Sequence, residues 1–316
     1  MIKVKKEIKK FLRQLLLGIL VGIILLLLFL IAYQIVSHIF DIVYGEKIVT
    51  QTLNNITGNL SDIDKISLSI MKWEKEYFYN PYSLWNPNST LQKYGIYKIN
   101  GSYRWFIRNA PVSWIIFSKL ANCEEYAKVF VYLMNKKGIK SRLVHAPGED
   151  HAWAEYYSED YKIVVDPSEN KTILDKKKFA EGRNWSYIES VDIFNISNIN
   201  DVSDEYIERG ILNIRVMSGN KSVEGVNVII KSPYLMKVYP ERYKKSKIVL
   251  INKTNKDGKV FFKLGEKEYI VEVRKSYFIF DIIFSKNVSV ISNKEINCSF
   301  NLDKDKSELR FLNWLD

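Results

Sequence analysis

One ordered set of side chains limits what this chain can fold into: Cys123, then His151, then Asp166. The chain has only two cysteines and three histidines, so chance offers few ways to place a thiol, an imidazole and a carboxylate in this order. Nucleophilic catalysis needs these three groups: a nucleophile, a base that takes its proton, and a carboxylate that orients the base. A fold that uses them must bring their positions together.

Residues 123–136 have the pattern of a helix that begins at Cys123. Glu124 and Glu125 are acidic first-turn residues, apolar residues recur at helical spacing after them, and Gly138 is typical of a helix end. A thiol at a helix N-terminus faces unpaired backbone N–H groups and the positive end of the helix dipole, and both favour the thiolate. Cys123 is therefore the predicted nucleophile.

Three segments after this helix alternate like half-buried strands, at residues 139–144, 151–156 and 161–165. An antiparallel sheet of these strands would place His151, which begins the second, beside Asp166, which follows the third. We therefore predict that His151 is the base and that Asp166 orients it.

Three short sequences carry a resemblance to a known family: Asn-Cys-Glu-Glu-Tyr-Ala around Cys123, His-Ala-Trp-Ala-Glu from His151, and Val-Asp-Pro around Asp166. With a helix first and strands after, they resemble the transglutaminase-like superfamily, which is related to papain-type cysteine proteases. The resemblance covers residues 61–206 and implies an α+β, papain-like catalytic domain with a Cys-His-Asp triad. One position departs from the family, since Ala121 stands where many members carry glycine.

The resemblance implies an enzyme that transfers an acyl group through a thioester on Cys123, without a cofactor or a metal. With water as the acceptor it would be a protease or amidase acting on a protein or peptide substrate, which we favour. With a lysine amine as the acceptor it would be a cross-linking transglutaminase. The Cys123 backbone N–H and Trp114 are candidate oxyanion donors, and Trp153 is expected beside the base in the cleft.

Each of these residues also has a plainer interpretation. A cysteine is often a small buried hydrophobe, a histidine near Trp153 can be a core residue, and an aspartate before proline can cap a turn. His145 is a rival base, but it lacks the His-x-Trp context, so we interpret it as structural. A metal site from His145, His151 and Asp166 fits no specific ligand spacing. A vestigial triad would instead make the chain a non-catalytic surface scaffold.

The N-terminus carries a second strong pattern, a basic segment followed by an apolar run. Residues 1–13 hold six Lys or Arg against one Glu, and residues 15–32 are all apolar or glycine. At about 1.5 Å per residue this run is about 27 Å long, close to the thickness of a bilayer core. We therefore predict a retained single-pass membrane helix at residues 14–37, with the N-terminus in the cytoplasm and the bulk of the chain outside.

Gly18 and Gly22 form a Gly-x-x-x-Gly pair, which would let two such helices approach as a homodimer or would simply face lipid. Residues 38–60 are expected to be a stalk. The net charge of +11 includes +5 from residues 1–13, and the remainder is dispersed without a basic patch interleaved with aromatic residues. We therefore predict the lipid bilayer, and no nucleic acid, as a partner.

Residues 207–316 change to short strands separated by turn signals, a pattern typical of an all-β sandwich domain. Three of their segments resemble the carboxypeptidase-regulatory-like (transthyretin-like) module, at residues 223–228, 254–261 and 268–273. The strands are expected at 211–216, 226–230, 248–251, 260–264, 269–273, 288–291 and 296–302.

Overall fold

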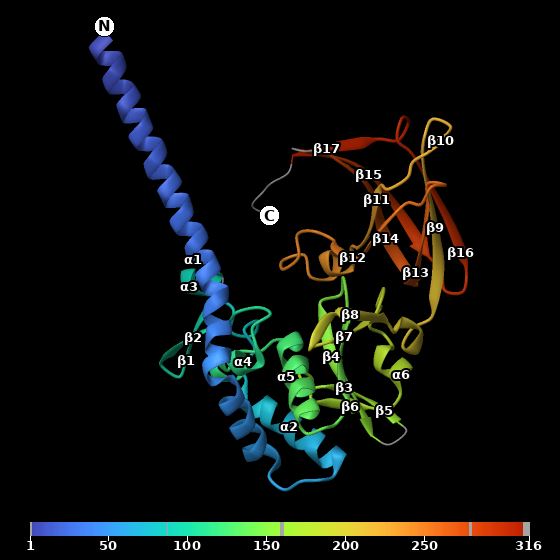
Figure 1. The fold of residues 1–316 in the computed structure, drawn as a ribbon. Helices are drawn as coiled ribbons and strands as arrows, with labels where there is room; N and C mark the ends of the chain where they lie inside the picture. Colours follow the sequence, from blue (N-terminus) through green and yellow to red (C-terminus); the bar gives the residue numbers. More distant parts are fainter. Residues whose placement is uncertain (1, 87, 159–160, 278–279, 312–316) are drawn as a thin grey trace. The chain divides into compact units, whose positions relative to one another are not determined.

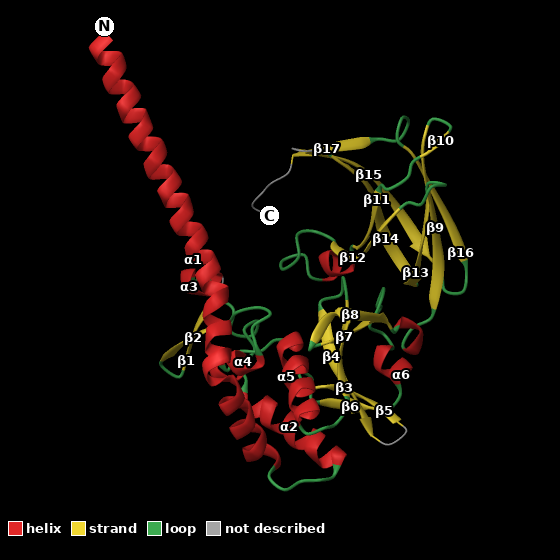
Figure 2. Cartoon of the chain, viewed as in Figure 1, coloured by secondary structure: helices red, strands yellow, loops and turns green. Residues whose placement is uncertain are grey.

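The structure is a computed structural model that describes residues 2–86, 88–158, 161–277 and 280–311; for residues 2–12, 25–34, 196 and 311 it describes the backbone alone. The chain forms two compact units, residues 1–125 and 126–316, each described here by itself. Helices dominate the first unit and strands the second (Figures 1 and 2).

The first unit is built around two helices, which run along its N-terminal half. The ring of Phe40 packs against Trp114 at a centroid distance of 5.4 Å, which joins the first helix to the fourth. The second helix is capped by Asp62, whose carboxylate accepts the Lys65 N–H at 2.8 Å. The elements of this unit are α1 (Ile2–Thr57), α2 (Ile63–Tyr77), α3 (Thr90–Lys93), β1 (Ile96–Ile99), β2 (Ser102–Trp105), α4 (Val112–Ser118) and the start of α5 (Cys123–Lys136).

Helix α1 extends through the segment expected as a stalk. Its described apolar side chains between Leu15 and Ile24 are exposed. Among the described residues, no helix is both long and apolar enough to cross a membrane. Residues 1–12 and 25–34, on which the anchor prediction partly rests, lie outside the described side chains. The anchor, its orientation and the Gly18–Gly22 contact stay predictions.

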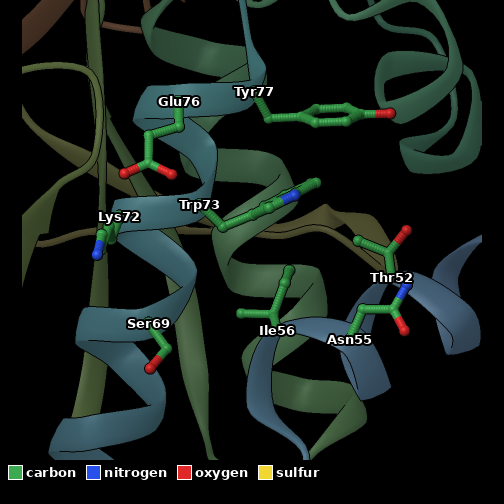
Figure 3. A pocket seen from close by; sticks show the side chains of 8 residues that line it. All are labelled: Thr52, Asn55, Ile56, Ser69, Lys72, Trp73, Glu76 and Tyr77. Carbon is green, nitrogen blue, oxygen red and sulfur yellow. The ribbon is translucent and has the colours of Figure 1, made fainter.

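A hollow of about 440 Å³ lies between the last turns of α1 and the C-terminal half of α2. Figure 3 shows the ring of Tyr77 above that of Trp73, with Ile56 below both. The two rings stack at a centroid distance of 4.8 Å. None of the predicted site residues lines this hollow.

The second unit begins with a six-stranded antiparallel sheet in the order β6-β5-β4-β3-β7-β8. Tyr156 on one face of this sheet packs against Phe130 of α5, and Trp153 on the other face packs against Phe179 of α6. The elements are β3 (Ser141–Ala146), β4 (His151–Ser158), β5 (Tyr161–Asp166), β6 (Lys171–Ile173), α6 (Lys176–Ala180), β7 (Glu189–Asp192), β8 (Asn195–Asp201) and a 3-10 turn at Ser203–Glu205.

The remaining residues form two further sheets that share one hydrophobic cluster. Leu212, Phe262 and Phe300 of one sheet meet Val228 and Val271 of the other in this cluster. One sheet contains β16 (Glu295–Asn301), β9 (Arg209–Ser218), β10 (Lys221–Ser222) and β13 (Lys259–Gly265). The other contains β12 (Lys247–Lys253), β11 (Asn227–Ser232), β14 (Lys267–Ser276), β15 (Phe280–Val290) and β17 (Ser307–Phe311), with α7 (Tyr234–Val238) between β11 and β12.

The strands expected after Tyr206 are therefore present, and β10 and β17 were not expected. The resemblance of this region to the carboxypeptidase-regulatory-like module stays a prediction, as does a domain boundary at residues 206/207.

Candidate active site

Cys123 is the first residue of α5, as predicted, and its helix end is capped by its neighbours. The Asn122 side-chain oxygen accepts the backbone N–H groups of Glu124 at 2.9 Å and Glu125 at 3.4 Å. The Glu125 carboxylate in turn accepts the Asn122 N–H at 3.1 Å, which completes a reciprocal capping box. The thiol therefore stands in the first turn of a well-formed helix.

The segment that leads into this helix is fixed by pairing with the end of α2. The Tyr79 N–H donates to the Lys119 carbonyl at 2.9 Å, and the Ala121 N–H donates to the Tyr79 carbonyl at 3.2 Å. Ala121 is fully buried, and its φ is not positive, unlike that of Lys119. The alanine that replaces the family's glycine is therefore compatible with the turn before Cys123.

His151 and Asp166 are brought together, as the strand pattern predicted. His151 is the first residue of β4 and Asp166 the last residue of β5. The His151 Nε2 and the Asp166 Oδ2 are 2.8 Å apart. Both residues lie in the second unit, whereas Cys123 lies in the first, and the approach of the thiol to this pair stays a prediction.

The Asp166 carboxylate is buried and held in its ionised form. Burial by itself would raise its pKa, but His151 outweighs this and lowers the pKa below the ordinary value, with help from Ser168 and Glu169. The Ser168 hydroxyl donates to Oδ1 at 2.7 Å, and the Glu169 backbone N–H donates to the same oxygen at 3.1 Å. One carboxylate oxygen is thus occupied by local donors, and the other engages the imidazole.

The imidazole lies in a stack of aromatic rings. Trp153 and Trp185 are nearly parallel, with centroids 4.5 Å apart and planes 5° apart. The His151 ring lies 5.8 Å from Trp153 and 6.2 Å from Trp185, within 25° of both planes. Trp153 therefore packs beside the base as expected, but it is fully buried and so lines no open cleft.

A buried charged network continues along the same face of β4 at Glu155. The Glu155 carboxylate accepts hydrogen bonds from Arg142 at 2.7 Å, from Lys176 at 2.7 Å and from the Tyr206 hydroxyl. Tyr206 also accepts the Trp153 indole N–H at 2.9 Å, which ties the network to the ring stack. Neither Glu155 nor Trp185 was predicted as a site residue, although the alternation of His151, Trp153 and Glu155 along a strand would have placed Glu155 on the face of the base.

Two other predicted residues have partners of their own. The Trp114 indole N–H donates to the Trp105 carbonyl at 3.2 Å, so this donor is already engaged. His145 pairs through Nε2 with Glu189 Oε1 at 2.8 Å. Among the described residues, His151, Asp166 and Glu169 have ligand-type atoms within 4.8 Å of one another.

This last cluster has the composition of a metal site, but its third member, Glu169, is already engaged. Glu169 pairs with Lys171 at 2.6 Å and with Arg183 at 2.8 Å. Two cations beside the carboxylate oppose the binding of a third, so the donor set favours an oriented imidazole over a metal centre.

Comparison with known proteins agrees with the motif at this site. Residues 89–167, a range that contains Cys123, His151 and Asp166, match a family model described as Transglutaminase-like superfamily. A peptide-N(4)-(N-acetyl-beta-glucosaminyl)asparagine amidase of Drosophila melanogaster is 30% identical over 122 residues, which are 37% of this chain and 19% of the fly protein. The chain thus spans about a fifth of the length of that curated relative.

Similar solved structures are more distant. A putative cysteine protease from Cytophaga hutchinsonii is 10% identical over 84% of this chain and 58% of its own, with a TM-score of 0.29. The shaft pilin SpaA from Lactobacillus rhamnosus GG is 11% identical over 30% of this chain and 50% of its own, with a TM-score of 0.25. At these scores neither likeness carries an argument. The sequence match itself shows that residues 89–167 are similar to the transglutaminase-like superfamily.

Proposed function

We propose that this chain is a cysteine amidase or peptidase that hydrolyses an amide bond through a thioester on Cys123. The observation that carries the proposal is the 2.8 Å hydrogen bond between His151 Nε2 and the buried Asp166. A carboxylate that engages one ring nitrogen selects the tautomer and assigns the other nitrogen, Nδ1, to the proton of the thiol.

The steps balance without a further reactant besides water. The Cys123 sulfur forms a bond to the carbonyl carbon while its proton moves to His151 Nδ1. The C–N bond then breaks as the imidazole returns this proton to the leaving nitrogen, which leaves a thioester. Water attacks the thioester with His151 as the base, and the carboxylic acid and the thiol are regenerated. Asp166 stays ionised throughout, because its local donors and the imidazole stabilise the charge.

The oxyanion that forms at the carbonyl needs donors near the sulfur. We assign the backbone N–H of Cys123 to this task, since it lies in the first turn of α5. Trp114 remains the second candidate, and it would have to release the Trp105 carbonyl to donate.

The comparisons support a family of cysteine-type amidases or hydrolases. The name of the fly relative describes an amidase acting on a glycosylated asparagine. We therefore include the side-chain amide of a glycosylated asparagine, besides peptide bonds, among the substrates proposed for this chain.

We further propose that the chain is anchored in the cell membrane through residues 14–37, with the enzyme outside. The basic residues before the apolar run support this, and so do the exposed apolar side chains from Leu15 to Ile24. Exposed apolar surface of this extent is characteristic of a segment that meets lipid or a partner.

Trapping the acyl-enzyme tests the activity. The full chain carrying Cys298→Ala would be incubated with activated peptide esters, peptide amides and an N-acetylglucosaminyl-asparagine peptide. The reaction would then be quenched with acid, and the mass of the protein would be measured by mass spectrometry. The expected result is one acyl group on Cys123 that disappears with time in water, and none on the Cys123→Ala variant. Transfer of the acyl group to added cadaverine would favour the transglutaminase alternative. If no probe forms an adduct with Cys123, the result would favour the alternative that the chain is a non-catalytic scaffold.

A further inference from the structure

We propose that the turn between β13 and β14, at residues 265–267, is a positioning element for His151, and that it acts by holding Trp185 against the imidazole. The proposal rests on the proposed function in one respect, that His151 is the base. It assigns to the C-terminal sheets a part in the site, which neither the triad motif nor the matched range of residues 89–167 includes.

Trp185 is the centre of the aromatic packing around the base. It is 4% exposed and stacks on both His151 and Trp153. Its ring also contacts Phe179 at 5.6 Å, and the Arg183 guanidinium lies 5.4 Å from the ring centroid. Trp185 lies outside any helix or strand, so neither a sheet ladder nor helical hydrogen bonds fix its backbone.

The β13–β14 turn supplies the missing backbone contacts on both sides of Trp185. The Gly265 N–H donates to the Ser186 carbonyl at 2.8 Å, and the Lys267 ammonium donates to the Asn184 carbonyl at 2.7 Å. The approach is close, because a Cβ atom on Gly265 would lie 2.2 Å from the Trp185 carbonyl oxygen. Glycine is therefore needed at position 265 for the turn to lie against the Trp185 segment.

A buried ion pair connects the same turn to the chain just before His151. Lys267 Nζ lies 2.6 Å from Glu149 Oε1, with side chains 7% and 2% exposed. The Ser186 hydroxyl donates to the same Glu149 oxygen at 2.6 Å. Glu149 precedes His151 by two residues and Ser186 follows Trp185, so Lys267 fixes both segments whose rings stack. Removing one partner of a buried ion pair leaves the other charge uncompensated. Substituting either Lys267 or Glu149 should therefore destabilise the fold.

The stack and Asp166 restrict the imidazole in different ways. The hydrogen bond to Asp166 holds Nε2 but leaves the ring able to turn about that bond. The parallel indoles hold the plane of the ring, and the plane decides where Nδ1 points. A catalytic group misplaced by about 1 Å can cost about a hundredfold in rate, so a displaced Trp185 should impair the base without removing it.

The test compares two glycines of the C-terminal sheets that are equally crowded. Gly265→Ala places a methyl group against the Trp185 carbonyl, whereas Gly210→Ala places one 2.2 Å from the Ile291 carbonyl, with no atom of Trp185 among its three nearest. In the full chain labelled with ¹⁵N-histidine, the ring of His151 would be titrated by NMR in each variant, and the rate of Cys123 alkylation would be followed against pH. The chain has only three histidines, which makes the assignment direct.

We expect Gly265→Ala to shift the His151 titration midpoint by about half a pH unit or more and to slow alkylation of Cys123 by about tenfold or more. Gly210→Ala should leave both unchanged at a similar loss of thermal stability. Unchanged His151 titration in folded Gly265→Ala would overturn the proposal, and so would equal shifts in both glycine variants.

A second pair of variants decides the matter if Gly265→Ala does not fold. Lys267→Met removes the buried cation, Lys267→Arg keeps it, and Lys237→Met removes the exposed partner of Glu268 as a matched control. The His151 shift should occur in Lys267→Met alone, and its absence there would overturn the proposal. If wild-type Cys123 proves unreactive while the His151 ring still responds to these variants, the proposed function fails and the positioning role stands.

Discussion

In the proposed reaction the Asp166 carboxylate orients the base, because it is ionised, buried and hydrogen-bonded to a single ring nitrogen. Three donors hold it, and only one of them is the imidazole. The carboxylate can therefore orient His151 without taking its proton, which is the task of the third member of a triad.

Substitutions at these positions should differ in severity. Cys123→Ala and His151→Ala should each abolish turnover, since neither the nucleophile nor the base has a replacement. Asp166→Asn keeps the shape but favours the wrong tautomer, so kcat should fall by about 10⁴-fold. His145→Ala should retain activity, because His145 pairs with Glu189 instead. Hydrolysis rates of the best amide probe would measure this series; an inactive His145→Ala beside an active His151→Ala would identify His145 as the base.

The two cysteines should differ in reactivity. Burial raises the pKa of the Cys298 thiol, which lowers its thiolate fraction near neutral pH. Cys123 begins helix α5 and is the proposed nucleophile, whose proton His151 is proposed to take. Iodoacetamide at pH 7 should therefore modify Cys123 at least about tenfold faster, as read by peptide mass spectrometry of the folded protein. Equal rates would contradict the assignment of the nucleophile, and Cys123→Ala provides the control for the slower site.

Sequence reasoning reached the residues whose chemistry is rare and missed those whose role is positional. Cys123, His151 and Asp166 stand out because few residues of their kind occur, and the structure confirms the contact between the last two. Trp185 gave no signal, since a tryptophan in an irregular segment between α6 and β7 is common in cores. The stacking of Trp185 on the His151 ring becomes apparent only in the folded structure.

At the scale of elements, one ion network joins β3, β4, α6 and the 3-10 turn. The Glu205 carboxylate forms ion pairs with Lys176 at 2.5 Å and with Arg142 at 3.2 Å. Burial opposes ionisation of Glu205, but these cations outweigh it and lower its pKa to about 2. Because the pKa of Glu205 is lower in the folded chain, its ionisation makes the free energy of unfolding depend on pH.

The sign of this dependence follows from the direction of the pKa shift. A carboxylate with a lowered folded-state pKa stabilises the fold above its unfolded value, about 4.3, and loses that contribution as the pH falls towards 2. Glu205→Gln should therefore be destabilised at pH 6 by on the order of 1 kcal/mol, given its partial exposure, and equal to wild type near pH 2. Urea midpoints from pH 6 to pH 2 would measure this. The exposed Glu224→Gln, which takes part in none of these ion pairs, is the control, and a difference that persists at pH 2 would contradict the ion-pair account.

The elements themselves were largely predictable, with informative exceptions. Helix α5 and strands β4 and β5 begin where their patterns begin. The N-cap of α2 is Asp62, although the neighbouring Ser61 suits the same role and the sequence pattern does not separate the two residues. Strands β7 and β8 were missed, since residues 189–201 are polar and rich in asparagine, and pairing with β3 overrides their weak strand propensity.

At the scale of the whole molecule, the apolar part of α1 sets the expected topology. Protease added to intact cells should digest an epitope after Asp316 and spare one before Met1, since the basic residues at the N-terminus favour retention inside. Immunoblots of both epitopes, with lysed cells as the control, would measure this. Protection of the C-terminal epitope in intact cells would rule out the proposed orientation.

The domain boundaries expected from the sequence patterns, near residues 60 and 206, stay predictions. Contacts divide the chain into two compact units at Glu125/Tyr126, within helix α5, which is a different kind of division. Pattern changes report where the type of element changes, but a compact unit is defined by contacts distant in sequence. The pair of Glu149 and Lys267, 118 residues apart, is one such contact.

The parallel pairing of β9 with β16 has a consequence for the order in which the nascent chain can mature. Residues 211–217 must wait for residues 295–301 before that ladder can form, and Glu149 must wait for Lys267. Contacts of such long sequence separation form slowly, and synthesis from the N-terminus delays them further. The candidate triad residues are synthesised well before the turn that we propose positions His151. On the proposed function, the active site of a chain still being translated would therefore stay incomplete until its last third has been added.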